Sequence, residues 1–140
     1  MSQIHRLARE GRLEELLEEL ARNPHNVDFK ENGATALHYA CGDCDENVVA
    51  ALVDAGADVT VSDLYGNTAL HIACMNNNCG PICRRLIAAG AVLSATDADG
   101  NTALHLACMC ENLEIAAMIV QNGGNLTIAD NVLTVSFLYF

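Results

Sequence analysis

The chain has 140 residues, of which 51% are hydrophobic and 18% are charged, so its composition is that of one folded domain and excludes a disordered chain. Eighteen acidic residues against seven Lys and Arg leave a formal charge of −11, which repels phosphate backbones and argues against a nucleic-acid partner. No apolar run approaches the roughly 20 residues of a membrane helix, and the N-terminal residues Met1–Arg6 lack the apolar core of a signal peptide. We therefore expect a soluble protein of the cytoplasm, the nucleus or both, with no membrane partner.

The first expected unit spans residues 2–29 and contains two helices. Ser2 stands at the start of the first helix, and Gly11 makes the turn to the second. The second helix is predicted by leucines spaced i, i+3, i+4 and i+7, namely Leu13, Leu16, Leu17 and Leu20. A run of acids predicts a solvated face that covers this end of the molecule. These acids are Glu10, Glu14, Glu15, Glu18 and Glu19.

A sequence motif then recurs three times along the chain. Its copies are Gly33–Cys41, Gly66–Cys74 and Gly100–Cys108. The step is 33 residues from Thr35 to Thr68 and 34 residues from Thr68 to Thr102. A second, glycine-containing motif recurs with nearly the same spacing, at Ala55-Gly56-Ala57, Ala89-Gly90-Ala91 and Asn122-Gly123-Gly124. Two motifs in phase at this period predict a repeat architecture.

Each repeated unit is predicted to be a helix, a tight turn, a second helix and an extended finger. The threonine of the motif is a good N-cap, and the histidine three residues later takes the place of Glu or Gln in a capping box. Leu70, Ala73 and Cys74 share one helical face, with small residues where a neighbouring helix must approach closely. The second helices are expected to end at C′ glycines, which are Gly56, Gly90 and Gly123.

The unit resembles the ankyrin-repeat family, whose hallmark is Thr-Pro-Leu-His on a unit of about 33 residues. The resemblance implies an all-α solenoid of stacked helix–turn–helix units with short β-hairpin fingers. It covers residues 1–130, divided into repeats one to four at about residues 2–29, 30–62, 63–96 and 97–130.

The chain departs from the family pattern at the proline and glycine positions. Alanine stands at the proline position in Ala36, Ala69 and Ala103, a mild change at a first helical residue. The glycine between the two helices of a repeat is replaced by Cys44, Asn78 and Glu111. Repeat three carries one extra residue within Met75–Pro81, so its inter-helix loop is expected to bulge.

Residues 131–140 form an apolar tail that lacks the repeat signatures and does not complete a fifth repeat. An uncapped solenoid end exposes its core, so one interpretation is that the tail folds over repeat four as a cap. The other interpretation is a poorly ordered end that is prone to β-association. We favour the cap.

The seven cysteines are odd in number and follow no secretory signal, so free and mostly buried thiols are expected rather than a disulfide framework. Equivalent positions of stacked repeats lie about 8–10 Å apart, whereas two ligands of one zinc ion lie within about 4–5 Å of each other. Cys41, Cys74 and Cys108 therefore cannot share an ion or a bridge. A thiol- or zinc-using protein is the alternative function that stays open, through Cys41, Cys44, Cys79, Cys83 and Cys110.

The hallmark residues of the motif are expected to be structural. They are Thr35, His38, Thr68, His71, Thr102 and His105, with the turn glycines Gly33, Gly66 and Gly100. The resemblance implies that the three histidines bond backbone groups and tie adjacent repeats together. The sequence shows no Ser/His/Asp or Cys/His triad and no Gly-rich phosphate loop. We therefore expect no enzymatic activity, no cofactor and no metal.

The resemblance implies a protein-interaction module whose partner binds the concave face of the fingers and first helices. Carried over by position, the partner-binding candidates are Phe29, Asn32, Asp43, Leu64, Tyr65, Asn67, Met75, Asn76, Asp99, Asn101 and Met109. Apolar and aromatic side chains at positions that stacking does not bury favour a binding site, centred on repeats three and four. The charge of −11 favours a protein partner with a basic surface. We expect a monomer that acts as an adaptor, a scaffold or an inhibitor.

Overall fold

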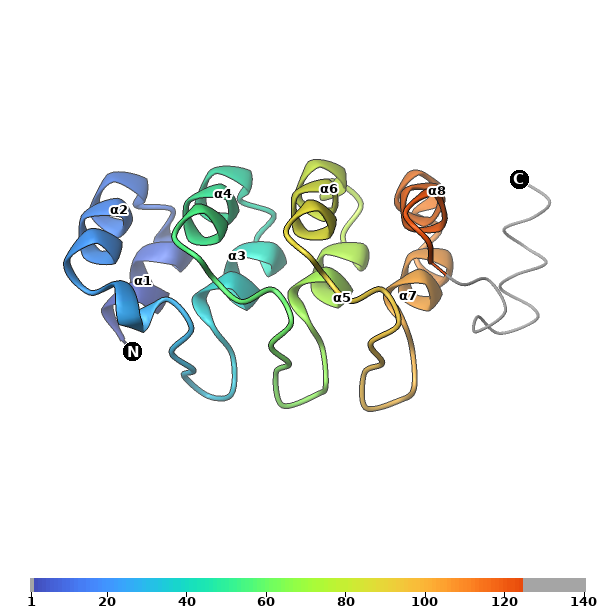
Figure 1. Cartoon of the computed structure of the whole chain (residues 1–140), viewed down its shortest axis with the longest axis horizontal. Helices are drawn as coiled ribbons and strands as arrows, with labels where there is room; N and C mark the ends of the chain where they lie inside the picture. Colours follow the sequence, from blue (N-terminus) through green and yellow to red (C-terminus); the bar gives the residue numbers. More distant parts are fainter. Residues whose placement is uncertain (1, 125–140) are drawn as a thin grey trace.

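The computed structural model describes residues 2–124 of the chain and shows them as a row of helix pairs (Figure 1). The first helices of the pairs are α1 (Gln3–Glu10), α3 (Ala36–Gly42), α5 (Ala69–Cys74) and α7 (Ala103–Met109). The second helices are α2 (Leu13–Arg22), α4 (Glu46–Asp54), α6 (Gly80–Ala88) and α8 (Leu113–Gln121). A 3-10 turn, η1 (Pro24–Asn26), follows α2. The predicted all-α solenoid is confirmed.

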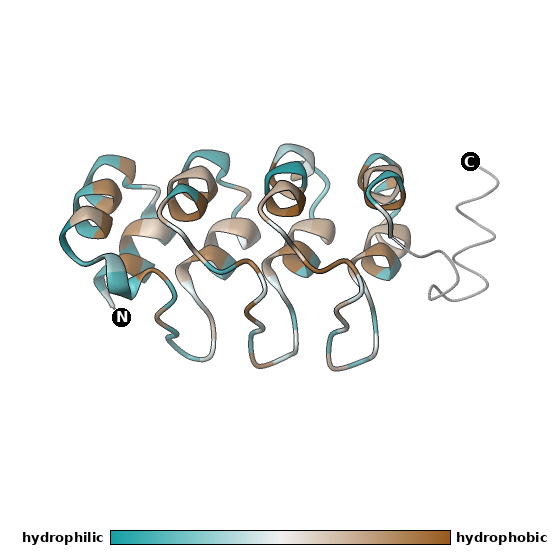
Figure 2. Cartoon of the chain, in the orientation of Figure 1, coloured by the Kyte–Doolittle hydropathy of each residue, from teal (hydrophilic) through white to brown (hydrophobic). Residues whose placement is uncertain are grey.

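Each helix pair packs mainly against its neighbours in the row. The first helices contact one another in the order α1, α3, α5, α7, and the second helices in the order α2, α4, α6, α8. Small side chains allow this close approach, because Ala40, Cys41, Ala73, Cys74 and Ala107 are all fully buried. The apolar sides of the helices face inward between the two rows, and polar residues occupy much of the outer side (Figure 2).

The first helices of repeats two to four begin at the predicted capping boxes. The backbone N–H of His71 donates to Oγ1 of Thr68 at 3.4 Å, and the backbone N–H of Thr68 donates to Nδ1 of His71 at 3.2 Å. The same pair of bonds joins Thr35 to His38 and Thr102 to His105. Each box satisfies two backbone donors that the helix itself leaves unpaired.

The other ring nitrogen of His38 and of His71 reaches the next repeat. Nε2 of His38 bonds the carbonyl oxygen of Asn67 at 3.0 Å, and Nε2 of His71 bonds that of Asn101 at 2.9 Å. His5 makes the equivalent bond to the carbonyl oxygen of Ala34 at 2.9 Å. Because Nδ1 of His38 and of His71 accepts a backbone N–H, Nε2 must carry the proton, which assigns the neutral tautomer.

The fingers between repeats are tight turns. Within residues 2–124 the ladder pairing of a hairpin is limited to one bridge, between Glu31 and Ala34. Asn32 and Gly33 turn this finger with φ of 53° and 81°, as an Asn-Gly hairpin turn requires. In the next finger, the Asp63 carboxylate accepts the backbone N–H groups of Tyr65 and Asn67, each at 2.9 Å.

The turns between the two helices of a repeat differ in length. Gly11, Cys44 and Glu111 occupy the left-handed region there, with φ of 68°, 53° and 58°. Asn78, which stands at the glycine position of repeat three, is not among the positive-φ residues of the described chain. The extra residue lets the loop 75–79 turn without a left-handed residue, and the expected longer loop is present.

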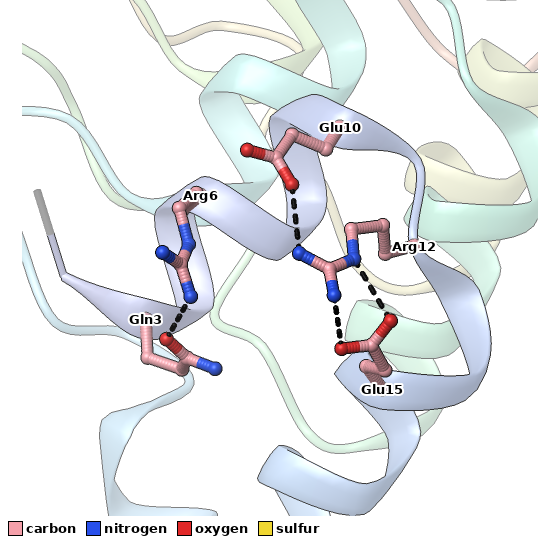
Figure 3. Close-up of polar contacts among 5 residues, drawn as sticks. All are labelled: Gln3, Arg6, Glu10, Arg12 and Glu15. Carbon is pink, nitrogen blue, oxygen red and sulfur yellow. Dashed lines mark hydrogen bonds and ion pairs between the residues drawn. The ribbon is translucent and has the colours of Figure 1, made fainter.

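The polar surface of repeat one is arranged around Arg12. Its guanidinium donates to Glu10 at 3.1 Å and to Glu15 at 2.8 Å, and it lies between the two helices (Figure 3). Arg6 donates to Gln3 on α1 at 2.6 Å in the same view. These exposed contacts add little stability individually, since solvent screens them.

Glu19 was expected on this solvated face, but its side chain is buried. Its carboxylate accepts from the Arg22 guanidinium at 3.3 Å and from the Asn23 amide at 2.8 Å, at the end of α2. Local polar partners therefore compensate its loss of water.

The apolar tail 131–140 lies outside the described residues, so the choice between a cap and a poorly ordered end stays a prediction. Within residues 2–124, no helix combines the length and the apolar composition of a membrane span.

Loss of a capping box is expected to destabilise the stack. Thr68→Ala removes the acceptor for the His71 N–H and should lower the free energy of unfolding by about 0.5–2 kcal/mol. His71→Ala leaves the buried Thr68 backbone N–H without its acceptor, removes the bond to the Asn101 carbonyl oxygen and should cost about 1–3 kcal/mol. Urea midpoints measure both, and unchanged midpoints would contradict the capping account.

Glu111→Gly is expected to stabilise the protein. Glu111 has a left-handed φ of 58°, which is unfavourable for a residue with a Cβ atom and which glycine adopts freely. The substitution removes a left-handed penalty of about 1–2 kcal/mol, but glycine also gives the unfolded chain more conformational freedom. The free energy of unfolding should therefore rise by up to about 1 kcal/mol. Glu111→Ala is the matched control, since it removes the carboxylate but keeps the Cβ. An equal effect of the two variants would show that φ is not the cause.

Candidate functional site

A groove of about 400 Å³ lies between the fingers and the first helices of repeats one to three. Helices α1, α3 and α5 and the fingers that precede α3 and α5 contribute its walls. The lining residues are Arg9, Asn32, Ala34, His38, Tyr39, Gly42, Asp43, Asp63, Leu64, Tyr65 and Ile72. The groove therefore contains four of the candidates predicted from sequence, which are Asn32, Asp43, Leu64 and Tyr65.

Leu64 and Tyr65 form the apolar rim of this groove at the tip of a finger. Their side chains are 75% and 72% exposed, which is far more than the solenoid core requires. The finger is held in place by its neighbours on both sides. Leu64 fills the space in which a Cβ at Gly33 would stand, and the Ala98 backbone N–H donates to the Tyr65 carbonyl oxygen at 2.9 Å. The apolar rim is thus presented on a backbone with a defined position.

An aromatic cluster contains Tyr39, which lines the groove together with Arg9. The Arg9 guanidinium lies 5.2 Å from the centroid of the Tyr39 ring, a cation–π contact. The His5 ring meets Tyr39 edge to face at 5.7 Å and Phe29 at 6.2 Å. These contacts link Phe29, a predicted candidate that does not line the groove, to the residues that do.

The polar groups of the groove carry charge of both signs. Asp43 is exposed at the C-terminal end of α3, and Asp63 is half-buried, with one carboxylate oxygen bonded to backbone N–H groups. Arg9 is the positive group and is held against Tyr39. Two carboxylates beside an apolar rim can accept hydrogen bonds from a cationic side chain of a partner.

The remaining predicted candidates lie outside the groove. Met75 and Met109 are 41% and 56% exposed at the ends of α5 and α7, and Asp99 is exposed on the last described finger. Asn67 and Asn101 are half-buried and accept the histidine bonds from the preceding repeat through their carbonyl oxygens.

Asn76 is half-buried as well. Its amide donates to the carbonyl oxygen of Ile72 at 3.2 Å, within the loop that carries the extra residue.

Sequence reasoning missed the contribution of Arg9, Tyr39 and Ile72 to the groove. Tyr39 is aromatic at the position where the later repeats have Ile72 and Leu106. That substitution within the repeat alignment was the available signal. Arg9 carried none, because its contact depends on how α1 stacks against α3.

The cysteines differ from the sequence prediction at one pair. Cys44 and Cys79 form a disulfide, with Cα atoms 5.7 Å apart, so the expectation of free thiols is wrong for these two. The spacing argument compared equivalent positions of the repeats, whereas this bond joins non-equivalent ones. The free cysteines are Cys41, Cys74, Cys83, Cys108 and Cys110.

The alternative thiol or zinc function finds little support in the free cysteines. Cys41, Cys74 and Cys83 are buried, and burial raises the pKa of Cys41. The pKa of Cys74 is raised chiefly by a hydrogen bond with Cys83 and, to a smaller extent, by burial. Residues 2–124 hold no group of three or more His, Cys, Asp or Glu side chains that could bind a metal ion.

A family model described as ankyrin repeats (3 copies) matches residues 4–97 and 64–130. The chain belongs to the ankyrin-repeat family. The match agrees with the capping boxes, the stacked helix pairs and the period of the motif. Ankyrin repeats are protein-interaction modules, and the groove lies on the surface that their fingers and first helices form.

A curated relative shares part of this repeat array. The tyrosine-protein kinase HTK16 of Hydra vulgaris is 39% identical over 54 residues. The matched segment is 38% of this chain and 7% of the kinase. The matched segment of this chain therefore corresponds to a small part of that protein.

His38 gives the ankyrin stack a pH dependence. Burial lowers the pKa of His38, against the hydrogen bond from Nε2 to Asn67, which raises it. The unfolded chain thus binds a proton more readily than the folded one. The contribution of neutral His38 to the free energy of unfolding is therefore fully present above about pH 6.5, and it is lost as the pH falls below that value.

When the pH is lowered from about 7.5 to about 5.5, we expect the urea midpoint of the wild type to decrease more than the urea midpoint of His38→Gln. Glutamine at this position keeps a capping acceptor without a titrating ring. Parallel pH profiles for the two proteins would show that His38 is not responsible.

Proposed function

We propose that this chain is a non-enzymatic module that binds one protein partner through the groove and the adjoining exposed residues of its concave face. The observation that carries the proposal is the exposure of Leu64 and Tyr65 on the rim of a groove of about 400 Å³. Aromatic side chains at such positions are typical binding anchors. The proposed centre of the site is therefore at repeats one to three, nearer the N-terminus than the centre expected from the sequence.

The charge of the molecule supports a partner with a basic surface. The whole chain carries a formal charge of −11, and Asp43 and Asp63 bring part of it into the groove. A net negative field accelerates the encounter with a basic protein, and dissolved salt screens it. Affinity is therefore expected to fall as ionic strength rises.

Adaptor, scaffold and inhibitor roles all use the same contact, so the proposal includes each of them, with the cytoplasm or the nucleus as the proposed location. The kinase that shares 54 residues with this chain contributes no activity to the proposal, because the shared segment is 7% of its length. The proposal concerns what the repeats bind.

Tyr65→Ala is expected to weaken partner binding by about 1–2 kcal/mol, which is about five- to thirtyfold in Kd. The partner is first captured from a cell extract on immobilised wild-type protein, identified by mass spectrometry and purified. Isothermal titration calorimetry then measures its affinity for the wild type and each variant. Leu64→Ala should weaken binding in the same direction.

Glu18→Lys on α2 is the matched control, since Glu18 is exposed and does not line the groove. Its affinity should stay within about threefold of the wild type once salt is raised, because a lone distant charge is screened. If Glu18→Lys abolishes binding and Tyr65→Ala does not, the binding face has been assigned incorrectly.

A further inference from the structure

The disulfide between Cys44 and Cys79 joins two consecutive repeats at their inter-helix loops. Cys44 lies between α3 and α4, and Cys79 immediately precedes α6, 35 residues further along the chain. The two Cα atoms are 5.7 Å apart, within the range that a disulfide bridges without movement of the backbone. Within residues 2–124 this is the covalent link between repeats.

The next repeat shows what the Cys79 position does without a disulfide. Asn112 precedes α8 as Cys79 precedes α6, and its amide donates to the carbonyl oxygen of Cys74 at 2.7 Å. The Cys79 sulfur lies 3.8 Å from the carbonyl oxygen of Cys41, the residue of α3 that corresponds to Cys74. A reduced Cys79 thiol therefore has the acceptor that the amide of Asn112 uses one repeat later.

The backbone conformation at Cys44 is also compatible with both the reduced and the oxidised state. Glu111 is its counterpart in repeat four and takes φ of 58° without any covalent link, against 53° for Cys44. The loop conformation thus does not depend on the sulfur–sulfur bond. Reduction leaves neither a buried polar group without a partner nor a backbone that must rearrange, so the folded chain accommodates both the dithiol and the disulfide.

Access to the two sulfurs is unequal. Cys79 is fully buried, whereas Cys44 is half-buried. The buried thiols of Cys41 and Cys74 have raised pKa values and form little thiolate, the species that attacks a disulfide. The accessible route is attack on Cys44 by a small thiol from solution.

We propose that Cys44 and Cys79 form a reversible redox modification site that exchanges with low-molecular-weight thiols of the glutathione class. An external thiolate attacks the Cys44 sulfur, the bond to Cys79 breaks, and Cys79 leaves as a thiolate that takes a proton from water. A second external thiolate attacks the mixed disulfide and releases Cys44. One protein disulfide and two external thiols become two protein thiols and one external disulfide. The reverse reaction uses that external disulfide as the oxidant.

The oxidised state links repeats two and three beside the groove. Gly42 and Asp43 line the groove directly before Cys44, and Met75 and Asn76 belong to the loop that carries Cys79. Oxidation holds these two loops at a fixed separation through a covalent bond, whereas after reduction they are joined by weaker hydrogen bonds, such as those to the Cys41 carbonyl oxygen, and can separate more readily. The effect on partner binding rests on the function proposed above, whereas the exchange itself does not.

The experiment uses the full chain equilibrated with oxidised or with excess reduced glutathione. Alkylation after denaturation counts the thiols, and we expect the five free cysteines in the oxidised protein and all seven in the reduced one. Hydrogen–deuterium exchange on the folded protein should show loops 43–45 and 75–79 exchanging about tenfold faster after reduction. Cys44→Ser should give six thiols in both buffers and should exchange as fast as the reduced wild type in both. Cys110→Ser, which changes an exposed free cysteine, should show the same redox response as the wild type with one thiol fewer in each state, four when oxidised and six when reduced.

Two results would overturn the proposal. Seven alkylated thiols in oxidised glutathione would show that the bond does not form, and five in excess reduced glutathione would show that it is permanent. Neither readout uses a partner, so they are independent of the proposed function. With the purified partner, equal affinity in both redox states would remove the link to the groove, whereas thiol exchange in a chain that binds no partner would refute the proposed function alone.

Discussion

The histidines of repeats one to three make hydrogen bonds in two directions, and the stacking of the repeats depends on them. Nδ1 accepts from the threonine that caps its own helix, and Nε2 bonds a carbonyl oxygen of the next finger, as in His38 and Asn67. One neutral imidazole thus fixes where a helix begins and where the following repeat lies. His5 continues the series into repeat one, where Ser2 replaces threonine. Since each repeat touches mainly its neighbours, stability is a sum over such local links.

Short-range chemistry made much of this fold predictable. A threonine followed three residues later by a histidine predicts a capping box, and small residues on one helical face predict close helix packing. Both features are complete within a few residues of sequence, and the structure contains both. The burial of Glu19 was not predictable in this way, because burial depends on how α2 packs against its neighbours, even though the partners Arg22 and Asn23 lie within four residues of it.

Features that depend on the register between repeats were harder to predict. The Cys44–Cys79 bond joins two loops of different length, and the extra residue in the second loop breaks the equivalence on which the spacing argument relied. The groove poses a similar problem, because Arg9 and Tyr39 come together only when α1 packs against α3. The exposed finger residues Leu64 and Tyr65 were predictable, since the repeat period alone places them outside the core.

The packing of one finger on the next couples the scaffold to the recognition surface. Leu64 lies over Gly33, and a Cβ at Gly66 would stand 2.7 Å from the backbone nitrogen of Ala98. A side chain introduced at residue 33 would push Leu64 aside, and one at residue 66 would displace the finger that follows. Substitutions at residues 33 and 64 are therefore not independent. If the proposed surface binds a partner, a mutation in one repeat that never touches that partner can change its selectivity, because the neighbouring repeat presents the displaced side chain.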